Sequence, residues 1–97
     1  MATALVHVRA DDLELAGSYE STGDVLYLSR AGDDKRGAVQ ETPEGHAVRL
    51  GADGEVTGVT AINARWLFER DGELVATLRD GRRLVVDART LQGLLDV

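Results

Sequence analysis

Residues 49–59 read RLGADGEVTGV, a stretch that is either a ligand-binding loop or a turn between two strands. Asp53 and Glu55 flank a glycine, but an EF-hand needs oxygen ligands at alternate positions and a glutamate at its twelfth. Counted from Asp53, the fifth position is Thr57 and the twelfth is Ala64. A phosphate-binding loop would be followed by a helix, whereas the strand-like run EVTGVTAIN follows here. The spacing therefore favours a β-hairpin.

Two turns can connect the strands of this hairpin. A two-residue turn of Asp53 and Gly54 would pair Leu50 with Thr57, whereas a three-residue loop with a left-handed Gly54 would pair Leu50 with Val56. A slip of one residue turns over the faces of one strand relative to the other. We prefer the three-residue loop, which puts one set of residues on a single face: His46, Val48, Leu50, Val56, Gly58, Thr60 and Ile62.

Short apolar runs separated by turn residues continue on both sides, a pattern typical of antiparallel strands. The sequence TPEG at 42–45 suits a type I turn, since proline fixes φ at the second position. Residues 25–29, VLYLS, are apolar on both faces, which predicts a central strand covered on both sides. A second hairpin is expected at 73–86, where a two-residue Asp-Gly turn would place Val75 opposite Val86.

Two segments have the period of a helix. In NARWLFERDG, a helix near 64–70 would begin after Asn63 as its N-cap and end at Gly72. The alternative for this segment is a strand paired across an Asp-Gly turn. At the end of the sequence, DARTLQGLLDV predicts a helix near 88–95, capped by Asp87. Its leucines have the spacing of one helix face: Leu91, Leu94 and Leu95.

These elements predict an α+β fold, with an antiparallel hairpin and meander sheet of about six to eight short strands and the two helices. The 97 residues fit a single globular domain, residues 1–97. The net charge is −6, and the basic residues are scattered, whereas nucleic-acid-binding proteins gather them on one face. There is no run of 18 apolar residues, no cysteine and no resemblance to a secretory signal. We expect a cytoplasmic protein that binds neither nucleic acid nor membrane.

Common catalytic motifs do not occur in the sequence: the phosphate-binding, dinucleotide-binding, nucleophile-elbow and zinc-protease patterns are all missing. A zinc site would need both of the two histidines and carboxylates brought together by the fold. No pair of the 17 acidic residues is singled out by its spacing. We expect no enzymatic activity, and hence no catalytic residue, no metal site and no cofactor.

The stretches SYESTGDVLYLS and TPEGHAVRLGADGEVTGVTAINA resemble the YuzE-like family of small bacterial domains of unknown function, over residues 19–64. Thr60 and Asn63 depart from the family pattern, which frequently has acidic residues there. The resemblance implies a compact α+β domain without a known activity, and it names no functional residues. Some members are thought to lie beside genes for small toxin-like proteins, which implies a binding role. The matching residues are Tyr19, Asp24, Leu26, Tyr27, Gly45, Val48, Asp53, Gly54, Val56, Gly58 and Val59.

The absence of catalytic motifs and the acidic charge indicate a small protein-interaction module. We expect it to associate with itself as a homodimer or to bind a basic protein partner, as an antitoxin does. Trp66 lies opposite the apolar face of its predicted helix, and exposed tryptophans are favoured at binding hot spots. The leucine face is the second candidate interface, formed by Leu91, Leu94 and Leu95, and its alternative is burial in the protein's own core.

A second hypothesis is a protein that binds a small ligand or a metal ion without catalysis. In this hypothesis four residues line a cleft: Tyr19, Tyr27, His46 and Asp53. Tyrosine hydroxyls more often find water or backbone partners.

Overall fold

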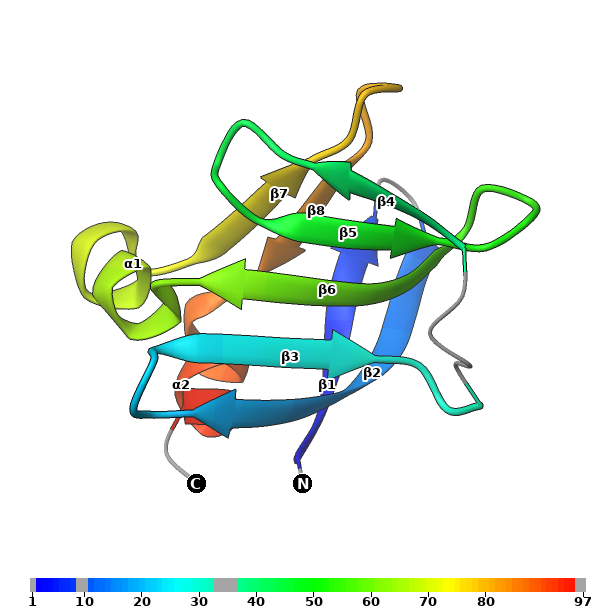
Figure 1. Ribbon diagram of the computed structural model, residues 1–97. Coiled ribbons are helices and arrows are strands. Elements are labelled where there is room, and N and C mark those ends of the chain that lie inside the picture. Colours follow the sequence, from blue (N-terminus) through cyan, green and yellow to red (C-terminus); the bar gives the residue numbers. More distant parts are fainter. Residues whose placement is uncertain (1, 9–10, 33–36, 96–97) are drawn as a thin grey trace.

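The computed structural model describes residues 2–8, 11–32 and 37–95 and has the predicted α+β fold (Figure 1). These ranges contain eight strands and two helices. Their order along the chain is β1 (Ala2–Val8), β2 (Asp11–Glu20), β3 (Val25–Ser29), β4 (Ala38–Glu41), β5 (Ala47–Leu50), β6 (Val56–Ile62), α1 (Ala64–Asp71), β7 (Leu74–Thr77), β8 (Arg83–Val86) and α2 (Ala88–Leu95). Both helices lie where the sequence predicts them, and the strand alternative for residues 64–70 is wrong.

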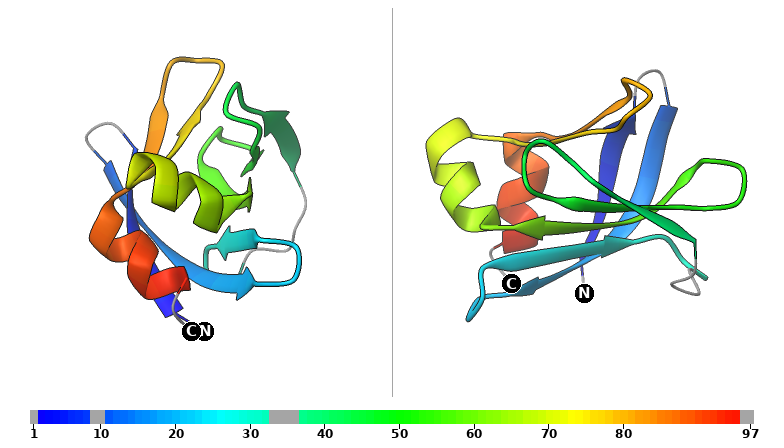
Figure 2. Two further views of the ribbon diagram at one scale, coloured as in Figure 1. Left: turned by 90° about the vertical axis from the view of Figure 1, so that its left-hand side faces the viewer. Right: turned by 45° about the horizontal axis from the view of Figure 1, so that its top comes forward.

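The strands form one antiparallel sheet in the order β4-β5-β6-β3-β2-β1-β8-β7. The β7–β8 hairpin joins the rest of the sheet through β1, where the described residues pair His7 with Val85 and Val8 with Leu84. The sheet curls strongly, so that its two ends approach each other, and both helices lie at one end of the curl (Figure 2). The two edge strands, β4 and β7, therefore face one another.

Side chains connect these two edge strands. Glu44, in the loop between β4 and β5, accepts hydrogen bonds from the Thr77 N–H at 2.9 Å and from the Thr77 hydroxyl at 2.6 Å. Gln40 of β4 accepts a hydrogen bond from the Arg79 N–H at 3.1 Å. Unpaired edge strands tend to pair with other chains. Here side chains occupy the N–H groups of Thr77 in β7 and of Arg79 just after it, along a line of contact that we call the seam.

Three hairpins use the same three-residue loop. In each one, the residue before the loop donates its N–H to the residue after it and accepts the N–H of the loop glycine. These glycines have positive φ, at 92°, 83° and 92°, a conformation that glycine adopts without steric cost. The three sets are Thr42, Gly45 and His46; Gly51, Gly54 and Glu55; Leu78, Gly81 and Arg82.

This loop confirms one predicted register and corrects another. The three-residue loop at Gly54 and the pairing of Leu50 with Val56 are as predicted. The two-residue turn predicted for the second hairpin is wrong, since Val75 pairs with Val85 and not with Val86. An aspartate followed by glycine fits either turn, and the longer loop keeps the side chain at position 78 in the core.

A bulge in β6 reverses part of the predicted face. Leu50 pairs with Val56 while Arg49 pairs with Gly58, so Thr57 is an extra residue. The predicted common face is correct up to this point, where the buried residues are His46, Val48, Leu50 and Val56. Beyond the bulge the prediction is wrong: Val59 and Ala61 are buried, and the outward positions are Thr60 and Ile62.

Strand β3 is central, between β2 and β6, as predicted. The prediction that both of its faces are covered is wrong. Leu26 and Leu28 are buried, whereas Tyr27 on the opposite face is 49% exposed. Both helices pack at the end of the curled sheet, and they leave the outer face of β3 open (Figure 2).

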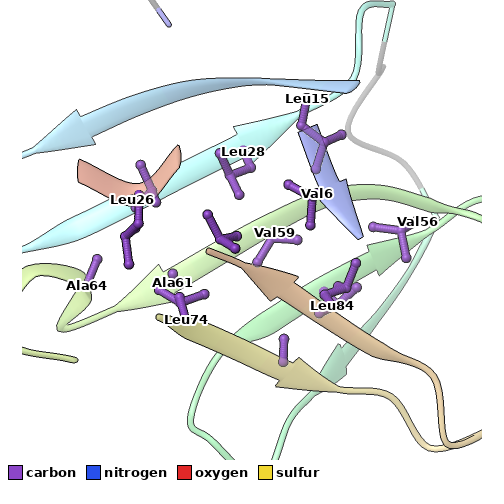
Figure 3. Packing of buried hydrophobic residues seen from close by; sticks show 14 of the residues in the cluster. Val6, Leu15, Leu26, Leu28, Val56, Val59, Ala61, Ala64, Leu74 and Leu84 are labelled. Atoms are coloured by element: carbon purple, nitrogen blue, oxygen red, sulfur yellow. The ribbon is translucent and has the colours of Figure 1, made fainter. Parts of the chain in front are cut away.

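The core lies inside the curl, where apolar side chains from the strands meet those of both helices (Figure 3). Helix α2 packs against β1, β2 and α1. It buries the three leucines proposed as an interface, which are at most 2% exposed: Leu91, Leu94 and Leu95. The interface hypothesis is therefore wrong for these leucines, since a helix at the end of the curl covers the core with its apolar face.

Asn63 does not cap α1 as predicted, because it has φ 59° and makes no side-chain cap hydrogen bond. The Asp24 carboxylate takes this role, accepting the Arg65 N–H at 2.8 Å and the Trp66 N–H at 3.3 Å. The Tyr19 hydroxyl donates to the same carboxylate at 2.7 Å. Partial burial raises the pKa of Asp24, but these hydrogen bonds outweigh it, so the pKa lies below its ordinary value. Asp24 thus fixes α1 to the β2–β3 hairpin.

Candidate functional site

A cavity of about 180 Å³ lies beside the seam, between the β4–β5 loop, α1 and β7. We call it the β7 cavity. It is smaller than the roughly 300–1,000 Å³ of sites for drug-sized ligands, so it suits a few non-hydrogen atoms. Charged and apolar side chains form its walls: Glu44, His46, Leu67, Arg70, Asp71, Glu73, Leu74 and Val75.

The outer edge of β7, an edge strand of the sheet, borders this cavity. The Leu78 N–H bonds to the Arg82 carbonyl, and in an antiparallel hairpin every second residue belongs to such a hydrogen-bonded pair. The residues between these pairs turn their backbone groups outward. Thr77 is one of them, and its N–H is taken by Glu44. Val75 is the next, and it lines the cavity.

His46 contributes a buried polar group to the cavity wall. It is 2% exposed, and its Nδ1 accepts the Ile62 N–H at 3.1 Å. Nε2 therefore carries the ring proton in the neutral form, and it has no hydrogen-bond partner in the described part of the chain. Burial lowers the pKa of His46, and the nearby Glu44 carboxylate only partly opposes this effect. His46 is thus a neutral donor at neutral pH.

The charged groups around the cavity are mostly acidic. Three carboxylates line it, from Glu44, Asp71 and Glu73, against one guanidinium, from Arg70. Arg70 is already paired with Asp71 through two hydrogen bonds of 2.9 and 2.8 Å. These bonds lower the pKa of Asp71. The excess of negative charge favours a cation or a basic surface.

Trp66 is the one residue of the predicted interface that is exposed, at 55%. Its indole lies beneath the Arg70 guanidinium, whose Cζ is 4.7 Å from the ring centroid. Because Arg70 also lines the β7 cavity, the tryptophan and the cavity form neighbouring parts of one surface. Tryptophan and arginine are both enriched at the hot spots of protein interfaces.

The four residues of the small-ligand hypothesis do not share a cleft. Of them only His46 lines the cavity. Tyr19 bonds to Asp24 at the base of α1, and Asp53 lies in the β5–β6 loop, where it accepts the Glu55 N–H. The residue set of this hypothesis is therefore wrong, although the structure does contain a cavity.

The outer face of the sheet carries further exposed apolar groups. Strand register places Tyr27 opposite Thr60 and Val25 opposite Ile62. The exposed large apolar side chains of this face within the described residues are Tyr27, Val39 and Ile62. These side chains lie on the face of the sheet opposite the core.

Within residues 2–8, 11–32 and 37–95, no three histidine or acidic side chains are grouped so that they could hold a metal ion. Neither helix of this part of the chain is long and apolar enough to cross a membrane. Comparisons with protein families, with curated proteins and with solved structures returned no match.

Sequence reasoning identified Trp66 and His46 but missed the carboxylates of the cavity. Glu44 and Thr77, which meet at the seam, are 33 positions apart. The one local signal was an acidic residue two positions before a histidine in the β4–β5 loop, and this pattern is common in turns.

The burial of neutral His46 predicts a pH-dependent stability. Folding lowers its pKa, so the unfolded chain binds a proton more readily, and stability falls as pH drops below about 6.5. The slope from this group is at most about 1.4 kcal/mol per pH unit. Urea unfolding of the wild type and of His46→Gln at a series of pH values measures this dependence of the unfolding free energy on pH. Equal pH profiles of the two proteins would contradict a neutral buried His46.

Proposed function

We propose that this protein is a small acidic module without enzymatic activity that binds a basic protein partner through the surface of α1. The exposed indole of Trp66 is the observation that carries the proposal. Exposed acidic side chains lie on and beside α1, which also carries Arg65 and Arg70: Glu44, Glu69, Asp71 and Glu73. An apolar anchor within an acidic rim is complementary to a basic surface with an apolar centre.

Charge favours a different protein over a second copy on this surface. Two copies would bring acidic rims of like charge together, whereas a basic partner would be attracted at long range. The outer sheet face with Tyr27 is the surface that self-association would use. An antitoxin-like role, a cytoplasmic location and kinship with the YuzE-like family belong to the same proposal.

Trp66→Ala tests the proposal. We expect a basic protein to be captured from the native cell by the wild type, and Trp66→Ala to weaken its affinity about 30-fold, as for a hot spot worth about 2 kcal/mol. Calorimetry with the purified partner measures the affinity. The unfolding free energy should change by less than about 1 kcal/mol, since only the exposed indole and its contact with Arg70 are lost.

The matched control is Tyr27→Ser, which removes a similarly exposed aromatic group from the outer sheet face. It should leave the affinity unchanged, and salt should weaken binding of the wild type. A partner that is lost with Tyr27→Ser and kept with Trp66→Ala would move the interface to the sheet. Recovery of no partner, or a dimer in light scattering that Trp66→Ala dissociates, would refute a basic protein as the occupant.

A further inference from the structure

The β7 cavity has two features that binding of a protein by Trp66 does not use. Its wall contains a buried donor without a partner in the described chain, the N–H at Nε2 of His46. Such a donor is unfavourable until an acceptor reaches it. The rim of the cavity carries an excess of carboxylates. The donor is complementary to an oxygen acceptor of a ligand, and the carboxylates are complementary to a cation.

The polar groups occupy different depths of the cavity. Nδ1 of His46 faces the backbone of β6 at Ile62, so the ring edge with Nε2 is turned away from that strand. His46 is buried, whereas Asp71 and Glu73 are exposed at the rim. Apolar surface from Leu67 and Val75 accompanies them. The cavity therefore has negative charge at its mouth, and a donor lies behind its inner wall, where a ligand oxygen reaches it by displacing neighbouring side chains.

The carboxylates are not equally available. Asp71 holds Arg70 through both oxygens, and Glu44 accepts two hydrogen bonds from Thr77. Glu73 remains as the carboxylate that can receive a cation. Because the Arg70 guanidinium is already held by Asp71, it does not make the cavity a site for anions.

We propose that the β7 cavity binds a small organic cation that also carries an oxygen acceptor, of the amino alcohol or amino amide class. The ammonium group pairs with Glu73, the oxygen accepts the hydrogen bond from Nε2 of His46, and the carbon chain contacts Leu67 and Val75. An apolar cavity of about 150 Å³ holds benzene, so a volume of about 180 Å³ fits a ligand only slightly larger. This site does not depend on a protein partner.

Three probes matched in their number of non-hydrogen atoms test the proposal: 5-aminopentan-1-ol, hexylamine and hexan-1-ol. Each is titrated into the ¹⁵N-labelled full chain at neutral pH, and the His46 ring nitrogens and the Val75 amide are followed by NMR. We expect 5-aminopentan-1-ol to shift these signals and to bind about tenfold more tightly than either probe with one polar group, since each lost polar contact costs about a factor of ten.

Two variants assign the contacts. Glu73→Gln should lower the affinity for 5-aminopentan-1-ol to that for hexan-1-ol, and His46→Leu should lower it to that for hexylamine. Glu55→Gln, in the β5–β6 loop away from α1, is the matched control and should change nothing (Figure 1). If His46→Leu does not fold, the probe series and the Glu73→Gln variant still test the proposal. Equal affinities of the three probes, shifts at another surface, or no shift up to the solubility of the probes would overturn the proposal.

Discussion

Replacing Asp24 with alanine is expected to lower the free energy of unfolding by about 3–7 kcal/mol. Three terms add to this loss. Removing the cap of a helix costs about 0.5–2 kcal/mol. The Tyr19 hydroxyl loses a charged acceptor, and such hydrogen bonds contribute about 1.5–3 kcal/mol. Alanine must also adopt the φ of 54° found at this position, at a cost of roughly 1–2 kcal/mol. Urea unfolding monitored by circular dichroism measures the sum.

Asp24→Asn and Tyr19→Phe separate these terms. Asparagine tolerates the left-handed conformation and keeps one acceptor oxygen, so Asp24→Asn should lose only about 1–2 kcal/mol. Tyr19→Phe removes one hydrogen bond to a charged acceptor and should lose about 1.5–3 kcal/mol. Because folding lowers the Asp24 pKa, its charge stabilises the fold above about pH 3.9, and this contribution disappears as pH falls through the lower pKa of the folded state. A stability of Asp24→Ala equal to that of the wild type would show that α1 does not need this cap.

The Asp24 cap shows which parts of the fold a sequence predicts. The existence of α1 follows from local signals, since an apolar face precedes a glycine at which a helix can end, and Gly72 does end it. Its cap does not follow from local signals, because Asp24 lies 41 positions before Arg65, whose N–H it accepts. Nearby Asn63 has the right chemistry for a cap, but its backbone is left-handed. Capping from another hairpin is a property of the tertiary fold.

Strand register, too, was predicted only in part from the sequence. The loop chemistry of Gly54 predicted the pairing of Leu50 with Val56, because turn geometry and register are coupled at the end of a hairpin. The extra residue Thr57 was not predicted, since the run around it contains small and apolar residues that fit either face. One bulge was enough to turn Ile62 to the outside.

The candidate site was also predicted only in part from the sequence. Exposure of Trp66 was predicted correctly, because helical periodicity alone puts it opposite Ala64, which is buried. The β7 cavity was not predicted, because it exists only where the curl of the sheet brings the β4–β5 loop beside β7. The strand order that puts these elements at opposite ends of the sheet is not visible in any short stretch of sequence. Periodicity also revealed the apolar face of α2 without showing that the core covers it.

Leu91→Ala tests the assignment of this face of α2 to the core. Leu91 is 0% exposed, and α2 packs on β1, β2 and α1. Truncating a buried leucine removes its burial and leaves a cavity, so we expect the free energy of unfolding to fall by about 2–5 kcal/mol. Thermal and urea unfolding of the monomer measure the loss. An interface residue would behave differently, with monomer stability nearly unchanged and binding of a partner reduced.

Gly93→Ala provides the control on the same helix, with an expected effect of opposite sign. A Cβ at Gly93 would meet no atom within 4 Å, so alanine fits without a clash. Glycine in a helix interior is less favourable than alanine by about 0.8–1.0 kcal/mol, so this variant should gain up to about 1 kcal/mol. In the double variant the gain should partly offset the loss at Leu91, because the two side chains act through packing and through helix propensity, respectively. A destabilised Gly93→Ala together with an unaffected Leu91→Ala would contradict the burial of α2 against the sheet.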